Sequence, residues 1–135
     1  MIKLLIIEES KSTSERLKQY LQQEGYEVFT ACNGLEGLGI IKSNTLDIVI
    51  TDILMPVMDG VEVILYLRKN CPEIKIIAMT SGGNINATEY FKVVKLLGVV
   101  FTLRKPFREN YLKNILNKLI ENRFSFEIPS LSKVR

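Results

Sequence analysis

Asp52 is the residue of this 135-residue sequence whose type and position most clearly indicate a chemical role. It follows an apolar run, residues 48–50, whose β-branched composition is typical of a buried parallel strand. Asp52 should therefore stand where that strand ends, which is where ligands collect in open parallel sheets. Met55-Pro56 then forces an extended turn, and Gly60 provides a flexible backbone before the next helix. A carboxylate at this place is either a turn residue or a nucleophile.

Four more polar side chains follow other expected strands. Glu8 and Glu9 come after the first strand, Thr80 after the fourth and Lys105 after the fifth. Because the carboxyl ends of parallel strands meet at one edge of the sheet, these groups should converge on Asp52. Crowded carboxylates repel one another unless a cation neutralises them. Mg²⁺, which prefers one or two carboxylates with water and phosphate oxygens, is the expected occupant.

This set of residues favours phosphoryl acceptance at Asp52 over a role as a turn residue. An ionised aspartate can attack phosphorus and form an aspartyl phosphate. The transferring phosphoryl group then mainly needs its oxygens neutralised. The metal, the Lys105 ammonium and the Thr80 hydroxyl would each serve one oxygen.

Alternating strand and helix patterns predict the elements that would position this site. Short apolar runs predict strands at residues 4–7, 28–29, 46–51, 74–79 and 99–103. A Ser, Asn or Asp followed three residues later by Glu predicts helix starts at Ser12, Asn33, Asp59 and Asn86. Right-handed crossovers would place the helices on both faces of the sheet. The fold class is therefore expected to be α/β, with a doubly wound five-stranded parallel sheet.

Composition and length limit the possible classes of protein. Hydrophobic residues at 47% and charged residues at 24% are typical of a globular protein. The first apolar run is too short for a signal peptide or a membrane span, so a cytoplasmic protein without membrane contact is expected. One domain is expected over residues 1–123, with a C-terminal tail over residues 124–135. Cys32 and Cys71 should be reduced thiols. Because the sequence has no histidine, a Ser-His triad, a histidine base and a histidine phosphocarrier are excluded.

The net charge of +3 is unevenly distributed. Residues 1–70 carry seven Lys or Arg against ten Asp or Glu, whereas residues 71–135 carry eleven against five. The basic half could meet an acidic partner or nucleic acid. A solvated basic face that only keeps the domain soluble is the alternative interpretation.

Four motifs, in this order and spacing, resemble the receiver domain of response regulators in bacterial two-component signalling. They are Leu-Leu-Ile-Ile-Glu-Glu at residues 4–9, Asp-Ile-Leu-Met-Pro-Val-Met-Asp-Gly at 52–60, Met-Thr-Ser-Gly-Gly at 79–83 and Lys-Pro-Phe at 105–107. The resemblance covers residues 2 to about 122. It implies a (βα)5 flavodoxin-like fold with strand order 2-1-3-4-5 and a cis bond between Lys105 and Pro106.

The resemblance also implies a role for each site residue. Asp52 would be the phosphoacceptor, and Lys105 would contact the phosphoryl group. Thr80 would be the switch hydroxyl. The ligands of Mg²⁺ would be Glu9, Asp52 and the backbone carbonyl of Leu54, and Glu8 would act through a metal-bound water. The family usually has two Asp, or Glu and then Asp, where this chain has two Glu, so the second carboxylate here stands one methylene further from the backbone.

Partners follow from the same resemblance. The phosphoryl donor would be a sensor histidine kinase or a histidine phosphotransfer protein, and the domain would signal rather than act as an enzyme, beyond self-phosphorylation and self-dephosphorylation. Phosphorylation would shift the fourth helix, fifth strand and fifth helix. The basic residues there favour an acidic downstream protein; they are Lys92, Lys95, Arg104, Arg108, Lys113 and Lys118. No helix-turn-helix effector, and so no direct DNA binding, is expected of this chain, and a homodimer is possible.

Two other functions remain open from the sequence. A degenerate receiver would keep the fold as a phosphorylation-independent binding module, and the paired glutamates motivate that hypothesis. An enzyme or flavin carrier on the same fold has less support, because the loop over residues 8–11 has no glycine-rich or Ser/Thr-rich phosphate cradle.

Overall fold

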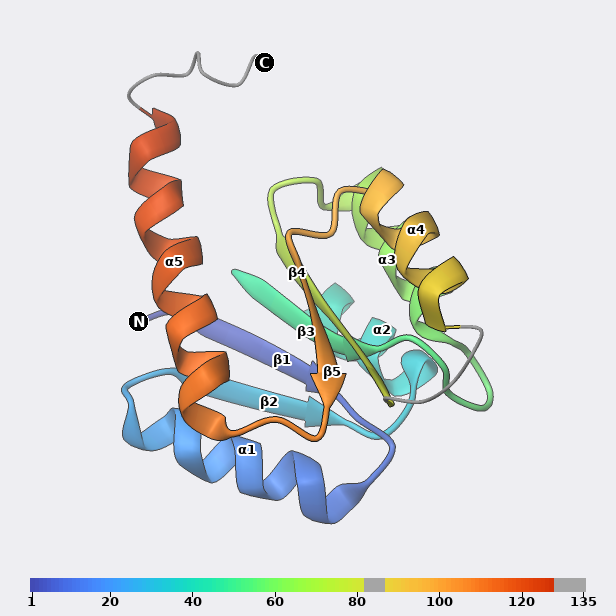
Figure 1. Ribbon diagram of the computed structural model, residues 1–135, viewed down its shortest axis with the longest axis horizontal. Coiled ribbons are helices and arrows are strands. Elements are labelled where there is room, and N and C mark those ends of the chain that lie inside the picture. The colour runs from blue at the N-terminus through green and yellow to red at the C-terminus, as the bar shows by residue number, and fades with distance from the viewer. Residues whose placement is uncertain (82–86, 128–135) are drawn as a thin grey trace.

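The computed structural model describes residues 1–81 and 87–127. Strands and helices alternate along this part of the chain (Figure 1). The strands are β1 (Lys3–Ile7), β2 (Glu27–Ala31), β3 (Ile48–Asp52), β4 (Lys75–Ser81) and β5 (Phe101–Lys105). The helices are α1 (Lys11–Gln23), α2 (Gly34–Ser43), α3 (Gly60–Asn70), α4 (Ala87–Leu96) and α5 (Glu109–Glu127).

All the strands pair in parallel in one sheet of order β2-β1-β3-β4-β5. This confirms the predicted α/β class, the doubly wound sheet and the strand order 2-1-3-4-5. The order places β3 at the centre, so the residue after it lies beside the ends of β1 and β4. Asp52 therefore lies in the middle of the carboxyl edge of the sheet.

Side-chain alternation along the buried strands builds a core on each face of the sheet. Leu4 and Ile6 of β1 pack with residues of α1 and α5, while Leu5 and Ile7 pack with residues of α2 and α3. Figure 1 shows α1 and α5 on one side of the sheet and α2, α3 and α4 on the other. Each fully buried leucine or isoleucine contributes roughly 1.5–3 kcal/mol, so the two layers hold the strand ends in fixed positions.

The helix starts follow the predicted caps, with one exception. Asn33 and Asp59 cap α2 and α3 by accepting from the amides of Glu36 and Glu62 at 2.8 and 3.1 Å. The start predicted at Ser12 is wrong, because Ser10 caps α1 and accepts from the amide of Thr13 at 3.3 Å. The cap predicted at Asn86 lies outside the described residues. Gly25, with φ of 99°, ends α1 as predicted.

Every strand differs by one or two residues at one or both ends from its predicted run, and two boundary differences change the position of a site residue or the length of a helix. Strand β5 covers Phe101–Lys105, two residues later than the predicted run, so Lys105 is its last residue. Helix α5 continues to Glu127, past the boundary expected at residue 123, and projects beyond the sheet (Figure 1). The division into a domain and a tail stays a prediction. Over the described ranges, no helix combines the length and apolarity that crossing a bilayer would need.

Candidate phosphoacceptor site

Asp52 is nearly buried at the carboxyl end of β3, with 5% of its surface exposed. Its backbone lies opposite Met79 in β4, and the amide of Ile53 donates to the Met79 carbonyl at 2.9 Å. The amide of Gly60 donates to the Ile53 carbonyl at 2.7 Å, which closes the loop that follows. Two neighbouring segments therefore fix the backbone of Asp52.

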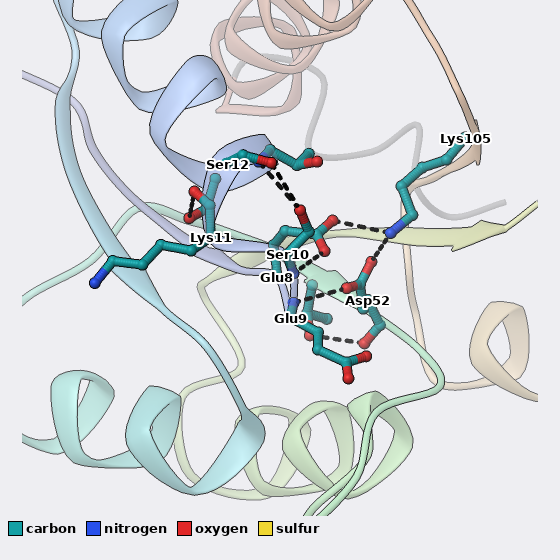
Figure 2. Close-up of polar contacts among 10 residues, drawn as sticks. Glu8, Glu9, Ser10, Lys11, Ser12, Asp52 and Lys105 are labelled. Carbon is teal, nitrogen blue, oxygen red and sulfur yellow. Dashed lines mark hydrogen bonds and ion pairs between the residues drawn. The ribbon is translucent and has the colours of Figure 1, made fainter.

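Lys105 joins Asp52 to Glu8. Its Nζ lies 2.8 Å from Oδ1 of Asp52 and 2.9 Å from Oε1 of Glu8 (Figure 2). The peptide bond between Lys105 and Pro106 is cis, as the resemblance implied. The last residues of β3 and β5 and the residue after β1 thus each contribute one charged group to a single ion-pair cluster.

The two glutamates occupy different surroundings. Glu8 is 2% exposed, and its Oε2 accepts from the amide of Ser10 at 2.7 Å, so both of its carboxylate oxygens have partners. Glu9 is exposed and touches the site through its backbone, whose amide donates to Oδ2 of Asp52 at 3.3 Å. In Figure 2 the Glu9 carboxylate makes none of the marked contacts. The two glutamates therefore differ in contact: Glu8 meets Lys105 through its side chain, and Glu9 meets Asp52 through its backbone amide.

A cavity of about 580 Å³ opens beside these groups. The predicted site residues Glu8, Glu9, Asp52, Leu54, Thr80 and Lys105 all line it. Ser10, Met79 and Ser81 also line it and were missed from the sequence. Ser81 could have been found, since it follows Thr80 in the motif over residues 79–83. Ser10 gave no such signal, because its place depends on the cap of α1.

Burial sets the ionisation of the cluster. The pKa of Asp52 is raised to about 6, mainly by burial and also by the Glu8 charge, although the hydrogen bond and charge of Lys105 and the hydrogen bond from the Glu9 amide lower it. Burial acts to lower the pKa of Lys105, but the hydrogen bonds and charges of Asp52 and Glu8 outweigh it and raise that pKa. Lys105 therefore stays charged, while Asp52 is ionised above pH 6 and protonated below it.

The chemistry of the donor groups fits Mg²⁺. Glu9, Asp52 and Leu54 line one cavity, and two carboxylates and a backbone carbonyl are hard oxygen donors. Among the described residues, no three Asp, Glu, His or Cys side chains gather closely enough to hold a metal by themselves. Mg²⁺ does not need that many, because it usually keeps several waters and uses one or two carboxylates.

The basic residues predicted around α4, β5 and α5 are only partly available to a partner. Lys113 pairs with Glu24, the residue after α1, at 2.9 Å, and Arg104 also has an interaction within the fold. Lys92, Lys95 and Lys118 are exposed there, as is Arg108. Exposed apolar side chains accompany them, namely Leu96, Val100 and Tyr111. The surface is thus mixed, basic and apolar, rather than uniformly charged.

Val57, in the loop after Asp52, adopts φ of 73° although it is β-branched. Such a conformation costs about 1–3 kcal/mol. Its side chain is 76% exposed and gains little packing in return. We expect Val57→Gly to raise the free energy of unfolding by about 1 kcal/mol in urea denaturation, because glycine adopts this conformation without strain. Val57→Ala keeps the Cβ and should recover less; an equal gain from both variants would contradict this explanation.

Comparisons with known proteins agree with this geometry. The family described as response regulator receiver domain matches residues 4–117. The chain is 34% identical over 120 residues to a probable transcriptional regulator, ycf29, of Pyropia yezoensis, covering 87% of this chain and 53% of that protein. It is 29% identical over 118 residues to sporulation initiation phosphotransferase F of Bacillus subtilis, covering 87% and 93%. The chain thus spans about half the length of one relative and nearly all of the other.

Solved structures give the same result. A response regulator receiver domain protein from Clostridium thermocellum superimposes with a TM-score of 0.82 at 29% identity, covering 93% of this chain and 99% of that one. Response regulator TrrA from Thermotoga maritima, in complex with Mg²⁺-BeF, gives a TM-score of 0.76 at 34% identity, covering 88% and 99%.

Proposed function

The chain belongs to the response-regulator receiver domain family, and on that premise we propose that it accepts a phosphoryl group on Asp52. The observation that carries the proposal is the meeting of Asp52 and Lys105 at 2.8 Å in a cavity that Thr80 also lines. The nucleophile, a cation for the incoming group and a hydroxyl donor come from three strands. Receiver domains are signalling domains, and the proposed role is a switch rather than turnover of a metabolite.

In the proposed reaction, an oxygen of the Asp52 carboxylate attacks phosphorus while the bond to the donor's leaving group breaks, and the leaving group departs with that electron pair. The amides of Glu9 and Ile53 hold the Asp52 side chain and backbone in place. Lys105 is positioned to neutralise one phosphoryl oxygen, and the Thr80 hydroxyl to donate to another. Bound Mg²⁺, held by Glu9, Asp52 and the Leu54 carbonyl, would neutralise the remaining charge. Glu8 acting through a metal-bound water stays a prediction.

We propose a histidine kinase or a histidine phosphotransfer protein as the donor. The similarity to a phosphotransferase that this chain covers almost along its whole length supports a relay role. The relative named as a probable transcriptional regulator is about twice as long as the match, so we base no proposal on its output.

The output proposed for this domain is protein contact through α4, β5 and α5. Thr80 and Lys105 lie at the ends of β4 and β5, so inward movement of either side chain toward a phosphoryl group acts directly on that layer. The exposed basic and apolar residues described above suit an acidic partner with an apolar patch. We also propose a second copy of the chain as a partner of this face.

The test is phosphorylation by a small acyl phosphate with Mg²⁺, followed by intact mass spectrometry. The wild-type protein should gain the mass of one phosphoryl group, and Asp52→Asn should gain none because its amide is not a nucleophile. Asp59→Asn is a matched control, since Asp59 caps α3 and asparagine caps equally well; it should be phosphorylated like the wild type. Equal gain in Asp52→Asn would place the acceptor elsewhere.

One observation favours a second function, a binding module that no longer accepts phosphate. Lys105 is already shared between two carboxylates, and Glu8 has no unpartnered oxygen in the described structure. If folded wild-type protein with ample Mg²⁺ gains no mass, this second function replaces the first.

A further inference from the structure

The first turn of α2 lies directly against the loop that joins β3 to α3. A Cβ built on Gly34 would lie 2.5 Å from the carbonyl oxygen of Met58 and 2.9 Å from its Cγ. Both distances are well inside van der Waals contact, so this position has no room for a side chain. Met58 belongs to the loop that follows Asp52 and carries Leu54. A glycine outside the strand ends thus touches the segment that begins at the phosphoacceptor.

Helix α2 is the firmly held side of this contact. Its start carries a reciprocal cap, in which Asn33 accepts from the amide of Glu36 at 2.8 Å and the carboxylate of Glu36 accepts from the amide of Cys32 at 2.8 Å. One turn later, Gly37 packs against the side chain of Ile7, which is fully buried in β1. Moving the helix would open this packing, so a side chain at residue 34 should displace the loop instead.

The β3–α3 loop is the side that can give way. The amide of Met58 donates to the Pro56 carbonyl at 2.8 Å, and the amide of Gly60 donates to the Ile53 carbonyl at 2.7 Å, so the loop turns tightly on itself. Val57 at its tip is 76% exposed and has φ of 73°, a strained value for a β-branched residue. A push on Met58 is therefore carried back along a short turn to the residues beside Asp52.

We infer that Gly34 is a positioning residue of the acceptor site. Its missing side chain allows the β3–α3 loop, with Leu54, to stay in place beside Asp52. The inference rests on the proposed phosphoacceptor function, but Gly34 touches neither the phosphoryl group nor the metal. A metal site loosens when its ligands are misplaced by roughly 0.5 Å, so displacement of this loop should be seen in the affinity for Mg²⁺.

Three glycines of the same helix give a matched series for Mg²⁺ titration by calorimetry. Gly34→Ala should weaken Mg²⁺ binding at least about tenfold, as expected when a group that supports a ligand is displaced. Gly37→Ala meets only the side chain of Ile7, and Gly39→Ala meets nothing within 4 Å. Both controls should bind Mg²⁺ within about twofold of the wild type. Unchanged affinity in Gly34→Ala, or an equal loss in Gly37→Ala, overturns the inference.

A double-mutant cycle tests the contact itself. Met58→Gly removes the Cγ and Cβ atoms that lie 2.9 and 3.0 Å from a Cβ at residue 34. With Met58→Gly already present, adding Gly34→Ala should weaken Mg²⁺ binding at least about threefold less than it does in the wild type, because residues in contact are not additive. Additive effects of the two changes overturn the inference.

Hydrogen exchange in chelator gives a readout without metal or phosphate. The Gly60 amide, bonded within the loop, should exchange at least about tenfold faster in Gly34→Ala. The Glu8 amide, which donates to the Ala31 carbonyl at 3.0 Å on the same edge of the sheet, should not change. Equal acceleration of both amides reports global destabilisation and overturns the inference. If the wild type gains no phosphate, the proposed function fails, and this exchange still decides the role of Gly34.

The wild-type protein provides a test that does not depend on the folding of any variant. Coupling between the metal site and α2 is reciprocal, so saturating Mg²⁺ should slow exchange of the Gly37 amide at least about threefold. This amide donates to the Asn33 carbonyl at 3.0 Å in the first turn of α2 and lies outside the cavity. The Tyr111 amide, bonded to the Arg108 carbonyl at the start of α5, is the control. No slowing at Gly37, or the same slowing at Tyr111, overturns the inference.

Discussion

Gly60→Ala is expected to lower the free energy of unfolding by at least about 3 kcal/mol and to displace Asp52. A Cβ built on Gly60 would lie 2.1 Å from the carbonyl oxygen of Asp52 and 2.8 Å from the Cα of Ile53. Both are backbone atoms at the end of a buried central strand, so neither can move aside cheaply. The Gly60 amide would also lose its 2.7 Å hydrogen bond to the Ile53 carbonyl. Urea denaturation and phosphorylation by acyl phosphate measure the two effects.

Two other glycines serve as controls for this variant. Gly39 lies in α2 with nothing within 4 Å of a built Cβ, so Gly39→Ala should stabilise the protein by about 0.5–1 kcal/mol. At Gly37 the closest atom, 2.4 Å away, is the end of the flexible Ile7 side chain. Gly37→Ala should therefore cost less than Gly60→Ala. Equal losses at positions 37 and 60 would show that backbone contact at Asp52 is not the reason.

Gly60 also shows what sequence reasoning could and could not reach. The sequence correctly predicted a glycine turn after Asp52, but it attributed the glycine to flexibility before the helix. In the structure the glycine is needed because the backbone of Asp52 approaches it closely. A side chain at residue 60 would collide with the Asp52 carbonyl. A local sequence pattern does not contain the distances between segments. The turn at Gly60 could therefore be predicted, but the close contact that requires a glycine there could not.

The fold was predictable because each strand contains a short apolar run and these runs alternate with helix patterns. The parallel sheet then brought Asp52, Thr80 and Lys105 to one edge without further information. The limits of β2 were missed, since Glu27 at its start and Thr30 before its last residue interrupt the hydrophobic pattern of this edge strand. The different contacts of Glu8 and Glu9 were missed for another reason. They depend on Lys105, 97 residues away, and on the cap of α1 at Ser10.

Lys105→Met is expected to destabilise the protein strongly and in a pH-dependent way. It removes the cation between two buried carboxylates, whose side chains are 3% and 7% exposed. Breaking a buried pair from one side costs about 3–5 kcal/mol, and because Lys105 itself is partly exposed we expect about 2–3 kcal/mol at pH 8. Lys92→Met, at an exposed site in α4, should change stability by less than about 0.5 kcal/mol.

The pH dependence follows from the pKa of Asp52. Its ordinary value is 3.8, and burial raises it to about 6 in the folded protein. Between these values the folded state binds more protons than the unfolded state. Stability from this group is therefore complete below pH 3.8 and is lost as the pH rises through 6. Removing Lys105 takes away the main group that lowers this pKa, so the loss should extend to higher pH and become larger.

Denaturation in chelator at pH 5 and pH 8 measures this slope in four proteins. Asp52→Asn should be more stable than the wild type at pH 8 by about 2 kcal/mol, with a smaller difference at pH 5, because the amide carries no charge to desolvate. Lys105→Met should lose more stability at pH 8 than at pH 5. Adding Asp52→Asn to Lys105→Met should restore at least half of the loss at pH 8, since only Glu8 is then ionised. If the double variant is no more stable than Lys105→Met, the cost of removing the lysine lies in lost packing of its methylenes and not in the two carboxylates that it joins.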